Sequence, residues 1–187
     1  MGKSTTAKMF ADEGIPVWDA DGVVHDLYAL NGDAVEIIRA SFPSAIVDAA
    51  VSRSHLRDLI TDNPHVLDQL QTLVHPLVIK SRQNFLDSNT GSIVVLDIPL
   101  LFETGTDVIC DVIVVVSVPA DMQRDRVLDR KQMSEADLDI FLLRQMPDAE
   151  KRKRADYIVE TLTLDSARAS VRLILQQLRD RHASNRS

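Results

Sequence analysis

The run DVIVVVSV at residues 111–118 constrains the fold more than any other stretch of the chain. It is nearly continuous valine and isoleucine, and Pro119 ends it. Hydrophobicity that does not alternate is typical of a strand covered on both faces, so this run predicts a buried strand of a parallel sheet. Three further apolar runs predict strands: residues 15–18, 92–98 and, more weakly, 156–160.

Helical patterns fill the chain between these runs. Apolar residues recur at helical spacing over residues 67–78 and 171–178. Strands that alternate with helices predict an α/β fold, in which helices flank a parallel sheet. Residues 31–89 have no convincing strand pattern, so we expect a helical insertion there, and we expect further helix over the polar residues 121–154.

Composition narrows the class of protein. The 187 residues are 45% hydrophobic, which is enough for one sizeable core. A net charge of -7 argues against a general nucleic-acid binder. The single Cys110 excludes an intramolecular disulfide, and no apolar run approaches the roughly 20 residues of a membrane span. We therefore predict a soluble, cytoplasmic protein without a signal peptide.

The chain begins MGKSTT, and Gly2, Lys3 and Ser4 match the second half of the phosphate-binding motif G-x-x-x-x-G-K-[ST]. In such a loop Lys3 reaches the β- and γ-phosphates, Ser4 contributes a hydroxyl to Mg²⁺ and Thr5 lies near the α-phosphate. The alternative is an ordinary helix start that a Ser or Thr caps. The first half of the motif and the strand before it are missing from the sequence, so we expect the natural chain to be longer at its N-terminus.

Two aspartates follow the apolar run at residues 15–18. If the chain is still extended there, Asp19 and Asp21 point the same way, toward the edge of the sheet where α/β proteins bind ligands. One carboxylate could then accept a proton from an attacking hydroxyl, while the other orients it or holds Mg²⁺ through water. The alternative is a turn or a helix cap that leads into the next helix.

Further candidate residues lie beside apolar segments. Asp97 ends a predicted strand before Pro99, where P-loop proteins commonly place a carboxylate near Mg²⁺, and Glu103 follows an apolar wall. His75 precedes Pro76, so we expect it at a helix break that faces a pocket. The alternatives are structural: a strand-end turn for Asp97 and an ordinary packed histidine for His75.

Basic residues cluster in the later half of this acidic chain. Arg126 and Arg130 are four apart and therefore share one helix face, and Arg144 follows. Guanidinium groups suit phosphate oxygens and the charge that develops during phosphoryl transfer. The alternative is a solvated helix that pairs its arginines with nearby acidic residues.

The order of these motifs is more specific than any one of them. The chain closely resembles the dephospho-coenzyme A kinase family, in order and spacing, through the segments GKSTTAKMFADEGIPVWDAD, LVHPLV, LDIPLLFETG, VVVSVPADMQRDRVLDR and RQMPDAEKRKRADYIVE. The likeness covers essentially the whole chain. It implies a three-layer, P-loop nucleotide-kinase-like α/β fold that transfers the γ-phosphoryl group of ATP, with Mg²⁺, to the ribose 3′-hydroxyl of dephospho-CoA. That reaction gives CoA and ADP and is the last step of coenzyme A synthesis.

The resemblance also implies a division of the chain into three parts. The nucleotide-binding core is expected in residues 1–30, 91–120 and 155–187, the helical acceptor-substrate region in residues 31–90 and the helical lid in residues 121–154. The acceptor is a small molecule. We expect no nucleic-acid or membrane partner, and a monomer or weak oligomer.

Residue roles follow from the same resemblance. Asp21 is implied as the base that accepts the hydroxyl proton, with Asp19 in support, and it acts together with Lys3 and Arg130. The other implied contacts are Gly2, Lys3, Ser4, Thr5, Arg130 and Arg144 for ATP; Ser4 and indirectly Asp97 for Mg²⁺; and Asp19, His75, Pro99 and Leu100 for the acceptor. Relatives place a second lid arginine a few residues before Arg144, where this chain has Ile140 and Phe141.

Two alternatives to this function stay open from the sequence, and a third, a generic α/β domain, is disfavoured by the joint pattern of motifs. One is a kinase of the same fold that acts on another small molecule, such as a nucleoside or nucleotide. The other is a truncated, inactive chain that only binds a ligand or a partner. Both keep the α/β fold and differ from the first interpretation in activity.

Overall fold

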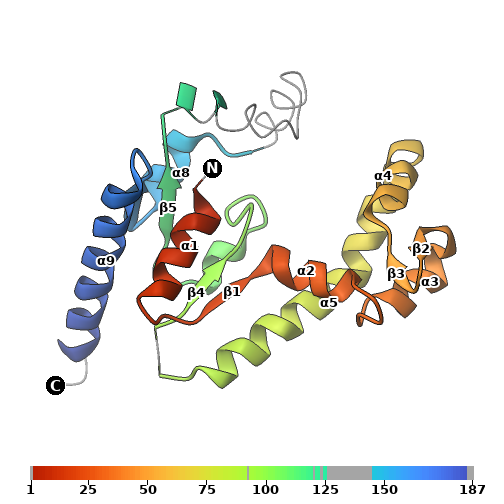
Figure 1. The fold of residues 1–187 in the computed structure, drawn as a ribbon, viewed down its shortest axis with the longest axis horizontal. Helices are drawn as coiled ribbons and strands as arrows, with labels where there is room; N and C mark the ends of the chain where they lie inside the picture. The colour runs from red at the N-terminus through yellow and green to blue at the C-terminus, as the bar shows by residue number, and fades with distance from the viewer. Residues whose placement is uncertain (1, 92, 120, 123, 126–144, 185–187) are drawn as a thin grey trace. The chain divides into compact units, whose positions relative to one another are not determined.

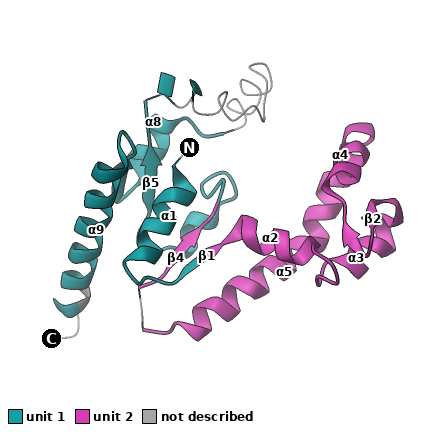
Figure 2. Cartoon of the chain, viewed as in Figure 1, with its two compact units in different colours: residues 1–17, 99–187 teal, residues 18–98 magenta. Residues whose placement is uncertain are grey.

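The structure is a computed structural model that describes residues 2–91, 93–119, 121, 122, 124, 125 and 145–184 (Figure 1). The chain forms two compact units, residues 1–17 with 99–187 and residues 18–98 (Figure 2). The expected lid arginines Arg126, Arg130 and Arg144 lie outside the described residues.

The first unit, residues 1–17 with 99–187, is built on a pair of parallel strands. β5 (Val114–Ser117) pairs with β6 (Tyr157–Glu160), and Ser117 lies opposite Glu160. Val, Ile and Tyr favour this extended, half-buried setting, and Val159 of β6 is fully buried. The parallel pairing that the continuous apolar run predicts is confirmed here.

Helices cover both strands of this pair. α9 (Leu164–Ser184) packs on β6 and on α1 (Lys3–Asp12), while α8 (Asp148–Arg154) packs on β5. A short 3₁₀ helix, η2 (Thr106–Ile109), lies in the segment before β5. The buried apolar side chains of the first unit are Met9, Phe10, Ile15, Val115, Val118, Val159, Ala167, Val171, Ile174 and Leu175.

The second unit, residues 18–98, is mainly helical, as the sequence predicts for residues 31–89. Its helices are α2 (Ala20–Tyr28), α3 (Val35–Ser41), the 3₁₀ helix η1 (Pro43–Ala45), α4 (Arg53–Asp62) and α5 (His65–Ser88). α5 packs against α2, α3 and α4. The core between these helices comprises Ala34, Val35, Ile38, Phe42, Ala45, Val51, Leu56, Val66, Leu70 and Val74. None of the described helices combines the length and apolar character that a bilayer span requires.

Two strands lead into and out of this helical region. β1 (Val17–Asp19) pairs with β4 (Val95–Asp97). Trp18 of β1 is buried, and its indole N–H donates to the hydroxyl of Ser81 in α5 at 3.2 Å. A buried indole needs such a partner, so this bond fixes the start of α2 relative to α5. Each of the four apolar runs therefore contains or overlaps a strand.

We expected no strand over residues 31–89, and this expectation is wrong at one point. β2 (Ile46–Val47) and β3 (Ala50–Val51) form an antiparallel hairpin. Its two turn residues, Asp48 and Ala49, have φ of 49° and 57°, as in a type I′ turn. Two-residue strands are too short to show periodicity, and the turn lacks the glycine that usually marks this geometry.

Ala49 in the left-handed region generates a stability prediction. An alanine there is strained by roughly 1–2 kcal/mol, whereas glycine is not, although glycine makes the unfolded chain more flexible. We expect Ala49→Gly to raise the free energy of unfolding by about 1 kcal/mol, measured by urea denaturation. The matched control Ala50→Gly, in strand β3, should lower it by about 0.5–1 kcal/mol. A destabilised Ala49→Gly variant would contradict this account.

Candidate functional site

The N-terminal turn of α1 has the properties of an anion site. Gly2 is the N-cap residue with φ 95° and ψ -16°, and no side chain caps the helix among the described residues. The first turn has no acidic residue, and Lys3 opens it. The alternative of a Ser- or Thr-capped helix start is therefore wrong. Backbone N–H groups and the positive end of the helix dipole favour a negative group at such a turn.

Glycine is required at the start of this turn for two reasons. A φ of 95° is strained for any residue with a β-carbon. In addition, a β-carbon on Gly2 would lie 3.0 Å from both Cγ2 and Oγ1 of Thr161. The Gly2 carbonyl accepts a hydrogen bond from the Thr6 N–H at 2.8 Å, which begins the helix. The backbone of Gly2 is thus fitted closely against the residue that follows β6.

A cavity of about 260 Å³ adjoins this turn. Its lining residues are Gly2, Thr5, Thr6, Met9, Thr161, Leu162, Thr163, Leu164 and Ala167. Thr6 is 2% exposed, and its hydroxyl has no hydrogen-bond partner in the described part of the chain. A buried hydroxyl without a partner is costly, so this wall of the cavity is suited to a polar ligand or a water molecule.

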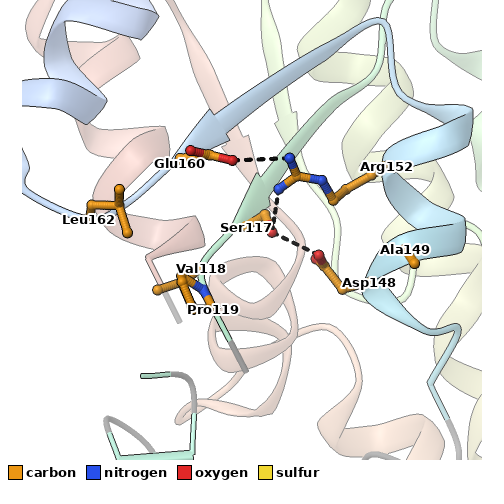
Figure 3. Close-up of a pocket in the computed structure, with 8 residues that line it drawn as sticks. All are labelled: Ser117, Val118, Pro119, Asp148, Ala149, Arg152, Glu160 and Leu162. Atoms are coloured by element: carbon orange, nitrogen blue, oxygen red, sulfur yellow. Dashed lines mark hydrogen bonds and ion pairs between the residues drawn. The ribbon is translucent and has the colours of Figure 1, made fainter. Parts of the chain in front are cut away.

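A second cavity, of about 350 Å³, lies where β5 and β6 end (Figure 3). Ser117 closes β5, and its hydroxyl donates to Asp148 at 2.8 Å. The guanidinium of Arg152 donates to the Ser117 hydroxyl at 3.1 Å and to Glu160 at 3.0 Å. The carboxyl ends of parallel strands are where open α/β sheets bind ligands. A cation and two carboxylates therefore line a cavity at the ligand-binding edge of the β5–β6 pair.

The hydrogen-bond network of this second cavity was not predicted from the sequence. Asp148 and Arg152 are four apart on α8, a spacing that puts both on one helix face. That spacing is the one sequence signal that could have indicated that Asp148 and Arg152 lie side by side. Their common partner, Ser117, lies 31 residues before Asp148, and no local pattern links them.

The two aspartates after β1 lie at a helix start. Asp19 is the last residue of β1 and the N-cap of α2, where its carboxylate accepts the Asp21 N–H at 3.0 Å. The chain is already helical at Asp21, so the two side chains do not follow each other in an extended chain, and the alternative of a helix cap that leads into the next helix is confirmed. Asp is a favoured cap because it satisfies an otherwise unpaired helix N–H. The turn leaves both side chains exposed and holds the backbone of Asp21 through Asp19.

Asp97 and His75, also in the second unit, have contrasting surroundings. Asp97 ends β4 and is 5% exposed. His75 is exposed within α5, which continues without interruption past Pro76. The expected helix break is therefore wrong, because the apolar face of this 24-residue helix, including Val74 and Leu77, keeps it packed on the core despite the N–H group that proline lacks.

The segment after β4 is anchored to α8. Leu100 has φ 56°, an uncommon conformation for a bulky residue, and its carbonyl accepts the Thr104 N–H at 3.0 Å. Glu103 accepts the Met146 N–H at 2.8 Å and pairs with Lys151 at 2.9 Å. Glu103 was expected beside a substrate wall, and the contacts that the structure shows for it join this segment to α8.

The structure brings together two sets of the expected site residues. Gly2, Lys3, Ser4 and Thr5 share the first turn of α1 in the first unit. Asp19 and Asp21 share the first turn of α2 in the second unit. In the part of the chain that the structure describes, no group of three or more His, Cys, Asp or Glu side chains is arranged to hold a metal ion.

The chain is similar over most of its length to proteins of a known family. A family model described as Dephospho-CoA kinase matches residues 1–164. A dephospho-CoA kinase of Ruegeria pomeroyi is 49% identical over 96% of this chain and 91% of its own length. One of a Jannaschia species is 51% identical over 95% of this chain and 92% of its own.

Solved structures have the same α/β fold. The crystal structure of TT1252 from Thermus thermophilus has a TM-score of 0.81 and 30% identity, over 95% of this chain and 92% of that one. A dephospho-CoA kinase from Campylobacter jejuni has a TM-score of 0.67 and 23% identity, over 95% and 91%. The α/β fold class that the sequence predicts is confirmed.

The Glu103–Lys151 pair generates a pH prediction. Burial acts to raise the pKa of Glu103, but hydrogen bonds from Lys151 and from backbone N–H groups outweigh it and lower the pKa. Folding therefore favours the ionised form. The resulting stability is present above the unfolded pKa, about 4.3, and is lost as the pH falls through the lower folded pKa.

We expect Glu103→Gln to lower the free energy of unfolding by about 1 kcal/mol at pH 7 and by progressively less as the pH falls below about 4, measured by urea denaturation at each pH. The matched control is Glu150→Gln, which removes an exposed pair with Lys153 on α8 and should cost less than about 0.5 kcal/mol. A Glu103→Gln deficit that persists unchanged at pH 3 would contradict the role of this charge.

Proposed function

We propose, because the chain belongs to the dephospho-CoA kinase family, that it transfers the γ-phosphoryl group of ATP to the ribose 3′-hydroxyl of dephospho-CoA and releases CoA and ADP. One observation of this chain carries the proposal. The Gly2-Lys3-Ser4-Thr5 turn is an uncapped helix start whose glycine is held in the left-handed conformation. Such a turn exposes N–H donors and a lysine to a chain of phosphates.

In the proposed reaction, the first turn of α1 binds the triphosphate. Lys3 neutralises the β- and γ-phosphates, and the Thr5 hydroxyl contacts the α-phosphate. Ser4 is exposed and does not cap the helix, so its hydroxyl is available as a hard oxygen ligand for Mg²⁺. Bound Mg²⁺ neutralises part of the charge on the phosphates. Buried Asp97 is proposed to act on the ion only indirectly, through water.

The proposed base is Asp21. Its carboxylate accepts the proton of the ribose 3′-hydroxyl while the new bond forms between that oxygen and the γ-phosphorus, and the bond to the β-phosphate oxygen breaks. Asp19 supports this role by holding the Asp21 N–H and thus the first turn of α2. Phosphoryl transfer asks mainly for positioning and charge stabilisation, so a capped, ordered turn suits the residue that orients the nucleophile.

Other parts of the chain are assigned to the acceptor and to closure. We assign His75, Pro99 and Leu100 to the wall that binds dephospho-CoA, within or next to the helical region 31–90. Exposure of His75 leaves it available for such a contact. Arg130 and Arg144, in the proposed lid at residues 121–154, are assigned to the ATP phosphates, where planar guanidinium groups bind well. Closure of a lid excludes water and thereby limits hydrolysis of ATP.

A direct assay tests the proposed reaction. Purified protein is incubated with ATP, Mg²⁺ and either dephospho-CoA or a nucleoside monophosphate, and the products are separated by chromatography. We expect ADP and CoA with dephospho-CoA, at a kcat/KM at least about a hundredfold above that for any nucleoside monophosphate, since a site that binds the acceptor through buried polar groups rejects analogues that lack them. A preference for a nucleoside monophosphate, or no transfer to either acceptor, would refute the proposal.

The role of Asp21 has its own test. Asp21→Asn keeps the size of the side chain but removes the proton acceptor, so we expect kcat to fall by roughly 10²-fold or more while ATP affinity changes little. Asp26→Asn, on the exposed surface of the same helix, is the matched control and should keep normal turnover. An Asp21→Asn variant with unchanged kcat would remove Asp21 from the role of base.

A further inference from the structure

We propose that Thr161, the residue that directly follows β6, is a positioning residue for the phosphate-binding turn: its side chain holds Gly2 in the conformation that receives ATP. The inference rests on the proposed function for the place of the nucleotide. It adds a residue that belongs to neither the GKST motif nor the other assigned site residues.

The Thr161 side chain lies where a β-carbon on Gly2 would have no room. A β-carbon on Gly2 would meet Cγ2 and Oγ1 of Thr161 at 3.0 Å each and its Cβ at 3.3 Å. Both branches of the threonine therefore occupy the side of Gly2 on which other residues carry a side chain. Glycine has no β-carbon to restrict its φ, so a neighbouring side chain can supply the restriction instead.

Thr161 is itself held firmly. It is 9% exposed, and its N–H donates to the Ser117 carbonyl at 3.0 Å, which continues the β5–β6 ladder by one residue. The Thr161 hydroxyl lies 3.5 Å from the same carbonyl, a long and weak bond. The Ser117 side chain is in turn held by Asp148 and Arg152. The sheet thus provides a rigid support on which Thr161 presents its two branches to Gly2.

The consequence concerns the order of the turn before ATP binds. The Gly2 carbonyl accepts the first helical hydrogen bond, from Thr6, so the orientation of Gly2 sets the first turn of α1. Without the two branches of Thr161, Gly2 gains access to other conformations. ATP would then have to order the turn as it binds, and affinity would fall by the corresponding amount. The affinity for dephospho-CoA should not fall, because the turn does not bind the acceptor.

Three substitutions separate shape from hydrogen bonding. Thr161→Ala removes both branches, and we expect the Kd for ATP, measured by titration calorimetry, to rise about tenfold. Thr161→Val keeps both branches and removes the hydroxyl together with its weak bond to the Ser117 carbonyl, so it should restore the Kd to within about twofold of the wild type. Thr161→Ser, which keeps one branch, should fall between them. In the kinetic assay Thr161→Ala should raise the KM for ATP without a comparable rise in the KM for dephospho-CoA.

The matched control is Val159→Ala in β6. Val159 is fully buried, so this change destabilises the same strand and lowers the melting temperature, but it is expected to leave the Kd for ATP unchanged. A purely structural role for Thr161 would make Thr161→Ala behave like Val159→Ala. Equal ATP affinity in those two variants, or a Thr161→Val variant as weak as Thr161→Ala, would overturn the inference.

The calorimetric titration needs no acceptor, which separates this test from that of the proposed function. A wild-type protein that binds ATP with the expected order of variants, yet phosphorylates no dephospho-CoA, would support the role of Thr161 and refute the acceptor assignment. If the wild-type protein phosphorylates dephospho-CoA normally and Thr161→Ala leaves the Kd for ATP unchanged, the acceptor assignment would be supported and the role of Thr161 refuted. A wild-type protein that binds no ATP would overturn both.

Discussion

The left-handed backbone of Gly2 is the constraint on which the candidate nucleotide site depends. With φ at 95°, the chain turns into α1 without a side-chain cap and leaves the helix start open to an anion. Thr161 fills the space that a β-carbon would need, so the turn fits against the end of β6. The GKST motif therefore relies on a contact with a residue more than 150 positions away.

The carboxyl ends of β5 and β6 extend this arrangement. Ser117 and Glu160, opposite each other at the strand ends, are joined through Arg152 of α8, and the residue after Glu160 reaches Gly2. A cation that bridges a hydroxyl and a carboxylate keeps two strand ends and a helix in a fixed relation. The second cavity and the phosphate-binding turn thus share one rigid support within the first unit.

Much of this molecule could be predicted from the sequence, because its signals are local. Nearly continuous valine and isoleucine over residues 111–118 indicated the strand β5, and helical spacing indicated α5 and α9. The family resemblance, which the comparisons confirm, rested on the order of several motifs, each of them weak by itself. The hairpin β2–β3 was missed because two-residue strands carry no periodicity.

The remaining differences between prediction and structure have two causes. Some side chains have partners that lie far away in the sequence, and at other positions two local rules conflict or packing overrides a local rule. The sequence left two arrangements open for Asp19 and Asp21, an extended chain or a helix cap, and the structure has the helix cap. Pro76 was expected to break a helix that core packing preserves. The partner of Glu103, Lys151, lies 48 residues later, and the Arg152 network likewise joins separate elements. Such pairs follow from tertiary packing, which a single sequence does not show.

The most direct test of the account is to locate the triphosphate on the chain. Protein labelled with ¹⁵N is titrated with ATP and Mg²⁺, and the backbone amide resonances are followed by NMR. The account predicts that the largest shifts occur at Lys3, Ser4 and Thr5, because their N–H groups form the open first turn of α1, whereas the Thr6 N–H is bonded to the Gly2 carbonyl. Saturable binding that leaves these three amides unchanged and shifts resonances elsewhere would contradict it.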